Sequence, residues 1–125
     1  MNGYLIVALG AAIGGALRHG VNVGSARVIG LDFPFGTLFV NIVGSLAMGV
    51  LAGYFAFKGD ALQSWRLFLT TGILGGFTTF SAFSLDFAVL YERGELVLAL
   101  AYVLGSVGLS IAALFAGLWI VRLLA

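Results

Sequence analysis

The sequence contains no cysteine, a single proline and only eleven charged side chains among its 125 residues. Without cysteine, the chain forms no disulfide, offers no thiolate to a metal and carries no cysteine nucleophile. So few charges do not supply the hydrated exterior that a soluble domain of this size requires. A net charge of +1 with no basic stripe argues against nucleic acid as a partner.

Hydrophobic residues make up 62% of the sequence, and the mean hydropathy is +1.15. Four charge-free runs approach or exceed the length of about 20 residues that a bilayer-spanning helix needs: Met1–Leu17, Phe33–Phe57, Leu67–Leu85 and Leu96–Val121. We therefore expect an all-α membrane protein with a single integral-membrane domain over residues 1–125. Its four transmembrane helices are expected at about 3–27, 34–57, 66–91 and 95–122. Pro34 suits the first turn of the second helix, with Asp32 as its cap.

The positive charges are nearly balanced between the two sides of the membrane. With four spans, both chain ends lie on one side. That side carries Lys58, Arg66 and Arg122, and the other carries Arg27, Arg93 and, if it reaches the surface, Arg18. The positive-inside rule then gives almost no preferred orientation. If both orientations occur, an antiparallel homodimer in membrane lipid becomes possible, and a four-span monomer has so little interior that we expect a dimer.

Several of the nineteen glycines recur at a spacing of four residues, which lets helix backbones approach closely in lipid. These pairs are Gly10/Gly14, Gly20/Gly24, Gly49/Gly53 and Gly72/Gly76. The pattern predicts tight helix packing.

Residues 75–84 read Gly-Gly-Phe-Thr-Thr-Phe-Ser-Ala-Phe-Ser and lie within the third hydrophobic stretch. Adjacent glycines and threonines disfavour an uninterrupted helix, so we expect a break near the middle of this span. Irregular backbone at membrane depth occurs where protein buries it or where it lines a cavity. Broken helices of this kind often mark ion sites. Carbonyl oxygens freed around Gly75 and Thr78 could hold a sodium ion, and in an antiparallel dimer two such breaks could meet on the two-fold axis.

Polar residues within the spans form stripes at helical spacing. The stripes are Thr37/Asn41/Ser45, Tyr102/Ser106/Ser110 and Arg18/Asn22/Ser25. Hydrogen bonding between helices would explain any one of them, but three stripes beside a broken helix favour an ion pathway. They supply hydroxyl and amide donors without a fixed negative charge, which favours a small anion. Phe80 and Phe83 share a helix face and could present their positive ring edges to it.

Titratable groups are scarce inside the spans. The only carboxylate there is Asp86, toward the end of the third span, and the single histidine, His19, has no nucleophile or second base beside it in sequence. Proton-coupled transport usually needs an intramembrane titratable group. The sequence therefore argues against an enzyme and against proton coupling.

The chain resembles, over essentially its whole length, the small bacterial fluoride channels of the CrcB or Fluc family. The resemblance rests on Gly-Thr-Leu-Phe-Val-Asn at residues 36–41, on the whole string at residues 75–84, on the Gly-Ala…Arg pattern ending at Arg18 and on the Tyr102/Ser106/Ser110 stripe. It implies a passive channel in the bacterial plasma (inner) membrane that exports cytoplasmic fluoride. It further implies a dual-topology homodimer with two antiparallel pores and a structural Na⁺ ion at the dimer centre.

The resemblance also implies roles for individual residues. The sodium ligands map to the backbone carbonyls of Gly75 and Thr78. The fluoride pathway maps to Asn41, Phe80, Phe83, Ser81, Tyr102, Ser106, Ser110, Thr37 and Arg18, the last at the vestibule. The chain departs from the family at Ala82, where threonine is common, and this removes one hydroxyl from the pore region.

Two alternative functions stay open. The first is a small dual-topology proton-coupled drug exporter, which would need an intramembrane carboxylate that the first span lacks. The second is a non-transporting structural membrane subunit, which would explain the glycines but not the polar stripes.

Overall fold

The computed structural model describes residues 2–59 and 62–124 and is helical throughout its regular structure. Three spans are continuous helices: α1 (Gly3–Val28), α2 (Phe35–Ala56) and α6 (Leu96–Leu124). The remaining span is composite and consists of α3 (Gln63–Arg66), η1 (Leu67–Leu74), α4 (Gly75–Phe77) and α5 (Ser81–Glu92). All four are long and apolar enough to cross a bilayer. The prediction of four spans with an interrupted third one is confirmed.

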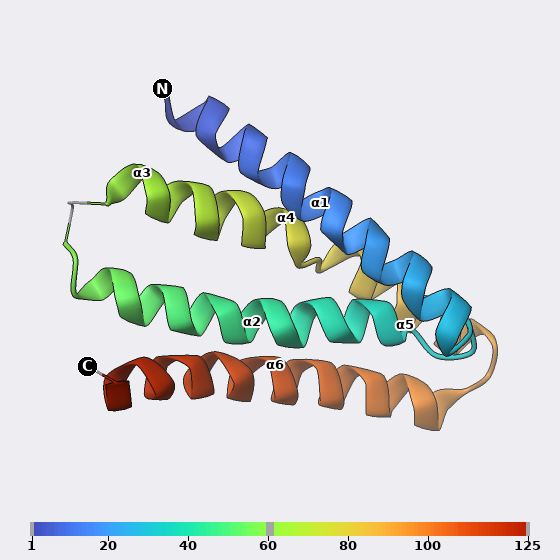
Figure 1. Cartoon of the computed structure of the whole chain (residues 1–125). Coiled ribbons are helices and arrows are strands. Elements are labelled where there is room, and N and C mark those ends of the chain that lie inside the picture. Colours follow the sequence, from blue (N-terminus) through green and yellow to red (C-terminus); the bar gives the residue numbers. More distant parts are fainter. Residues whose placement is uncertain (1, 60–61, 125) are drawn as a thin grey trace.

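The spans alternate in direction along the chain, so that both ends of the chain lie at the same end of the bundle (Figure 1). Within the bundle, α2 and α6 lie side by side and run in the same direction. The composite span packs against α1 and runs opposite to α2. The short connections at residues 29–34 and 93–95 lie together at the other end (Figure 1).

The start of α2 differs from the expected one. Phe35 is its first residue, Pro34 precedes the helix, and the Pro34 carbonyl accepts a hydrogen bond from the amide of Leu38 at 3.2 Å. No side chain caps this end, so the prediction of an Asp32 cap is wrong. Asp32 lies two residues before Pro34, whereas a capping side chain acts from the residue that directly flanks the helix. The other helix ends lie no more than three residues from the expected positions.

Glycines set the contact between α2 and α6. A Cβ atom added to Gly49 would overlap the carbonyl oxygen of Leu114, and one added to Gly117 would overlap the carbonyl oxygen of Leu46. Each helix therefore presents a glycine to the backbone of the other, which is the packing that small residues permit in membranes.

The contact between α1 and the composite span has the same character. A Cβ on Gly14 would overlap the carbonyl oxygen of Ile73, and a Cβ on Gly76 would lie 2.6 Å from the carbonyl oxygen of Ala11. Close packing is thus confirmed for three of the four glycine pairs. Gly20 and Gly24 are the exception, because a Cβ at either position meets nothing within 4 Å in this chain.

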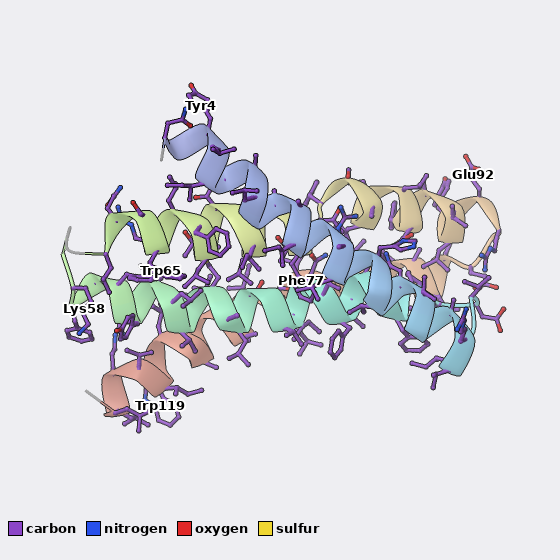
Figure 2. The ribbon with its side chains drawn as sticks, turned by 45° about the horizontal axis from the view of Figure 1, so that its top comes forward. Tyr4, Lys58, Trp65, Phe77, Glu92 and Trp119 are labelled. Carbon is purple, nitrogen blue, oxygen red and sulfur yellow. The ribbon has the colours of Figure 1, made fainter. Side chains whose placement is uncertain are left out.

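The exterior is apolar along its length and aromatic near one end. Tyr4, Trp65 and Trp119 are largely exposed, and they lie toward the end of the molecule opposite Glu92 (Figure 2). Amphipathic aromatic rings gather at the boundary between bilayer and water. Phe77 lies between these two ends (Figure 2), which places the interruption of the third span at membrane depth. The structure is that of a multi-pass membrane protein.

A methyl group at Gly117 should destabilise the bundle. Overpacking of a close contact costs about 1–3 kcal/mol, so Gly117→Ala should lower the free energy of unfolding in mixed micelles by that amount. Gly108→Ala on the same helix is the matched control, because a Cβ there meets nothing within 4 Å. Equal unfolding free energies for the two variants would contradict the contact.

Candidate functional site

The third span is interrupted at Thr78–Phe80. The helix continues through the two glycines to Phe77, and Thr78 is extended, with φ −87° and ψ 160°. Helical structure resumes at Ser81. The break therefore lies three residues later than the glycines suggested. Gly76 remains helical and provides the close approach to α1 described above.

Side chains from two other spans satisfy the backbone at the break. Asn41 on α2 accepts a hydrogen bond from the Thr79 amide at 2.8 Å through Oδ1, and its Nδ2 donates to the Thr79 carbonyl at 3.0 Å. Arg18 on α1 donates through Nε to the Gly76 carbonyl at 3.1 Å. Because lipid offers no hydrogen bonds, these partners make irregular backbone tolerable at this depth.

The residues before the break form a π-helix, η1, which the sequence did not predict. Two threonine hydroxyls donate back to carbonyls four residues earlier: Thr70 to Arg66 at 2.6 Å and Thr78 to Leu74 at 2.9 Å. Single-turn π-bulges inside α-helices are frequent at functional sites. In this chain, η1 ends at Leu74, and α4 separates it from the break.

A cavity of about 240 Å³ lies beside the break. We call it the track cavity. Its lining comes from the break and from the polar faces of α2 and α6, and comprises Asn41, Ser45, Thr78, Thr79, Phe80, Phe83, Ser106, Val107 and Ser110. None of these residues carries a formal charge. The hydroxyl oxygens of Ser106 and Ser110 are buried and have no hydrogen-bond partner within the described part of the chain. A helical serine hydroxyl can donate a hydrogen bond to a backbone carbonyl in the preceding turn. These two hydroxyls make no such bond among the described residues, so they are available to a ligand.

The paired phenylalanines form one wall of the track cavity. Their ring centroids lie 5.5 Å apart, with the ring planes tilted by 58°. Phe83 is buried, whereas Phe80 is 77% exposed and so lies at the surface of the chain. Aromatic edges carry partial positive charge, so the wall can lie against an anion without supplying a full charge.

A second cavity of about 260 Å³ opens near the connections at residues 29–34 and 93–95. We call it the vestibule. Thr37, Asp86, Asn22, Ser25, Phe33, Ala82 and Arg93 are among its lining residues. Tyr102 on α6 is fully buried and lines neither cavity, and its hydroxyl donates to Asp86 Oδ2 at 3.0 Å.

Comparison with known sequences identifies the family. The family described as CrcB-like protein, Camphor Resistance (CrcB), matches residues 5–118. The chain belongs to the CrcB-like family. A relative from Nitrobacter hamburgensis, named Fluoride-specific ion channel FluC 2, is 58% identical over 95% of this chain and 96% of its own length. Relatives named Fluoride-specific ion channel FluC are 61% identical in Rhodopseudomonas palustris and 59% in Methylobacterium nodulans, each over at least 94% of both chains. The family is one of channels rather than enzymes.

For this CrcB-like chain, the structure brings together five of the nine residues that we predicted for the pathway. Asn41, Phe80, Phe83, Ser106 and Ser110 line the track cavity, as does Thr78, whose carbonyl we predicted as a sodium ligand. The other four predicted pathway residues lie elsewhere.

Each of those four has a different environment. Thr37 lines the vestibule, and Tyr102 is fully buried and lines neither cavity. Arg18 bonds to the backbone next to the break. Ser81 is exposed and contacts the Thr79 hydroxyl at 3.4 Å. Asp86 was missed as a site residue, although it is the only carboxylate in the run from Leu67 to Tyr91.

Removal of the Asn41 side-chain amide should destabilise the backbone conformation at the break. Asn41→Leu has nearly the same size but leaves the Thr79 amide and carbonyl without their partner, which costs about 1–3 kcal/mol for each group. Hydrogen exchange at residues 78–82, measured in micelles, should therefore accelerate about tenfold or more. Ser45→Ala, one turn further along α2, is the control and should leave this exchange unchanged. Full protection in Asn41→Leu would show that Asn41 does not hold the break.

Proposed function

We propose that this chain forms a passive, fluoride-selective channel in the bacterial plasma membrane and exports cytoplasmic fluoride. The observation that carries the proposal is the track cavity. Its lining combines two buried serine hydroxyls that have no partner among the described residues with a pair of phenylalanines, beside a broken transmembrane helix. The names of the relatives, Fluoride-specific ion channel, support the same function.

The chemistry of the track cavity suits a small anion that binds hydrogen-bond donors strongly. Fluoride leaving water needs donors in place of its hydration shell, and Ser106, Ser110 and the second Nδ2 hydrogen of Asn41 can supply them. Among the described residues, the lining has no carboxylate to repel an anion. A proton-coupled exporter would need one at this position, so the lining does not favour that alternative.

Passive export is sufficient for protection against fluoride. Hydrogen fluoride crosses membranes as a neutral acid and ionises inside, so fluoride accumulates in the cytoplasm. A negative-inside potential drives the anion outward through any selective path. The channel therefore needs neither a nucleotide site nor a coupled ion.

We further propose an antiparallel dual-topology homodimer with a structural sodium ion at its centre, held by the carbonyls of Gly75 and Thr78. In a continuous α-helix, those carbonyls would accept hydrogen bonds from the amides of Thr79 and Ala82. Here the Thr79 amide donates to Asn41 Oδ1, and the Ala82 amide donates to Thr79 Oγ1 at 3.2 Å. Both carbonyls are thus released from helical pairing, and carbonyl oxygens are suitable ligands for sodium.

The exposure of the break supports the dimer. Gly75 and Phe80 are exposed on the isolated chain, and they lie within three residues of Phe77, which is found midway between the two ends of the molecule (Figure 2). A second copy placed there would cover them and add its own pair of carbonyls to the ion. The balanced positive charge of the two sides supports insertion in both orientations.

Fluoride efflux from liposomes tests the channel. Purified protein should release fluoride, measured with a fluoride electrode, while chloride is retained in a parallel sample. Phe80→Leu keeps an apolar side chain but removes the ring edges, and we expect it to slow efflux at least about tenfold, equivalent to about 1.4 kcal/mol of barrier. Phe115→Leu, on the exposed face of α6, is the control.

The outcomes separate the alternatives. Equal efflux from the two phenylalanine variants would contradict the role of the track cavity. No fluoride release from folded wild-type protein would contradict the channel and favour a non-transporting membrane subunit.

Removal of sodium tests the central ion. A ligand that binds only the folded dimer stabilises it by RT ln(1 + [L]/Kd), about 1.4 kcal/mol for each tenfold rise in concentration above Kd. Exchange of sodium for N-methyl-D-glucamine at constant chloride should therefore lower the melting temperature and favour monomer in size-exclusion chromatography. Identical melting curves in the two cations would contradict a structural sodium ion.

A further inference from the structure

We propose that the chain binds an anionic phospholipid at the end of the molecule opposite Glu92. One acyl chain would lie in a groove between α1 and the start of the composite span, with the lipid phosphate at Arg66. The site shares no lining residue with the track cavity or the vestibule, and it does not depend on the proposed channel function. Three observations carry it: an apolar groove, a positioned guanidinium and the distribution of charge between the two ends.

A third cavity, of about 340 Å³, lies between α1 and the start of the composite span, and we call it the outer groove. Its lining comprises Ile6 and Leu9 from α1 and Ser64, Trp65 and Phe68 from α3 and η1. Leu9 is 47% exposed and Trp65 is 60% exposed, so the groove opens to the surroundings of the protein. Those surroundings are lipid, and an open apolar groove at this place suits an acyl chain.

The outer groove has a polar mouth and an apolar interior. Both α1 and the composite span begin at this end of the molecule (Figure 1), so Ser64 lies nearer to the end than Phe68 does. The Ser64 hydroxyl is therefore at the mouth, and apolar side chains line the groove further inward. Trp65 lies near the same end (Figure 2), where amphipathic rings mark the boundary between hydrocarbon and headgroups. A phospholipid has the same order of parts, a polar headgroup followed by apolar chains.

The side chain of Arg66 is positioned to hold a phosphate at the mouth of the groove. Its Nη2 donates to Oε1 of Gln63, which lies about one turn nearer to the end of the molecule, so the guanidinium is directed toward the headgroup layer. This bond uses one of the five N–H donors of the guanidinium. Arginine binds phosphate through paired N–H groups, and the neighbouring Ser64 hydroxyl can donate to a further headgroup oxygen.

Acidic side chains distinguish the two ends of the molecule, although the basic side chains are nearly balanced. The positive-inside rule counts only lysine and arginine, so it does not register this difference. In sequence, the helix ends and connections on the groove side carry Lys58, Arg66, Arg122 and Asp60, and those on the opposite side carry Arg27, Arg93, Asp32, Glu92 and Glu95. Anionic headgroups attract basic side chains near the membrane surface. The end with the outer groove therefore favours an anionic lipid over a zwitterionic one.

Quenching of tryptophan fluorescence by brominated lipid tests the site. The sequence contains two tryptophans, Trp65 and Trp119, so Trp119→Phe leaves Trp65 as the single reporter. The protein is reconstituted in phosphatidylcholine vesicles with rising fractions of brominated phosphatidylglycerol or, in a parallel series, brominated phosphatidylcholine. The two curves give the relative affinity of the lipids at Trp65. We expect a preference of about fivefold for phosphatidylglycerol, the factor that one basic side chain contributes at an anionic surface.

Trp65→Phe is the control for non-specific attraction, because it leaves Trp119 as the reporter. Trp119 is 61% exposed, about as much as Trp65, and Arg122 follows it by about one turn. It belongs to the lining of none of the three cavities. A cation without a groove should give a preference below about twofold, because exposed charge pairs contribute little.

Arg66→Gln in the Trp119→Phe background tests the headgroup contact. Without the guanidinium, the preference at Trp65 should fall to about twofold or less. Lys58→Gln is the matched loss of charge at the same end. The Lys58 ammonium lies 5.2 Å from the ring centroid of Tyr54 on α2, which is not part of the outer groove, so this variant should keep a preference of about fivefold.

Leu9→Phe in the same background tests the groove itself. The larger ring would occupy part of the space, so both brominated lipids should quench Trp65 less at every lipid fraction. Leu5→Phe is the matched control, because Leu5 is 48% exposed, nearly the same as Leu9, but does not line the groove.

The contrary outcomes identify what else would explain the groove. An equal lipid preference at Trp65 and Trp119 would show only general attraction to a basic end. Quenching of Trp119 without quenching of Trp65 would show that a second copy of the chain covers the groove. A preference that survives Arg66→Gln would remove the headgroup contact. Each of these results overturns the lipid site and leaves the channel proposal standing, because none of the measurements involves fluoride.

Discussion

The pairing of one asparagine side chain with one backbone unit makes this fold possible in a membrane. Asn41 accepts from the Thr79 amide and donates to the Thr79 carbonyl, as a neighbouring strand would. The two bonds satisfy the backbone amide and carbonyl of Thr79, which lies in the break. It also diverts the Thr79 amide from the Gly75 carbonyl, which becomes available as a ligand. The backbone conformation of the break, the shape of the track cavity and the candidate cation ligands all depend on this single interaction.

The position of the break could be predicted only approximately from sequence. The hydrophobic runs identified all four spans, because bilayer thickness fixes their length. The string at residues 75–84 correctly indicated an interruption, but the adjacent glycines drew attention to the wrong residues. They stay helical because α1 packs against Gly76, a contact between helices that sequence spacing does not reveal. The π-helix η1 could not be predicted either, because a π-helix has no sequence pattern of its own.

The candidate site was predicted in part. Helical periodicity correctly placed Asn41 with Ser45 and Ser106 with Ser110, because residues four apart share a face. It could not show that the α2 stripe passes from the vestibule at Thr37 to the track cavity at Asn41. Tyr102 continues the α6 stripe in sequence, yet it is buried outside both cavities and its hydroxyl donates to Asp86. Periodicity gives the face of a helix but not the partner on the neighbouring helix, and that partner decides whether a hydroxyl is free.

In a site of this kind, the choice between anions depends on which hydrogen-bond donors are not already paired within the protein. Thr78 and Tyr102 each donate to an acceptor of the chain itself, to the Leu74 carbonyl and to Asp86 respectively. The Ser106 and Ser110 hydroxyls have no partner among residues 2–59 and 62–124, and they line a space that also contains phenylalanine. Leaving a buried donor unpaired costs free energy, and an anion that accepts strong hydrogen bonds recovers that cost best. A larger, weakly accepting anion would lose its hydration and recover less, so in the proposed channel these hydroxyls would favour fluoride over chloride.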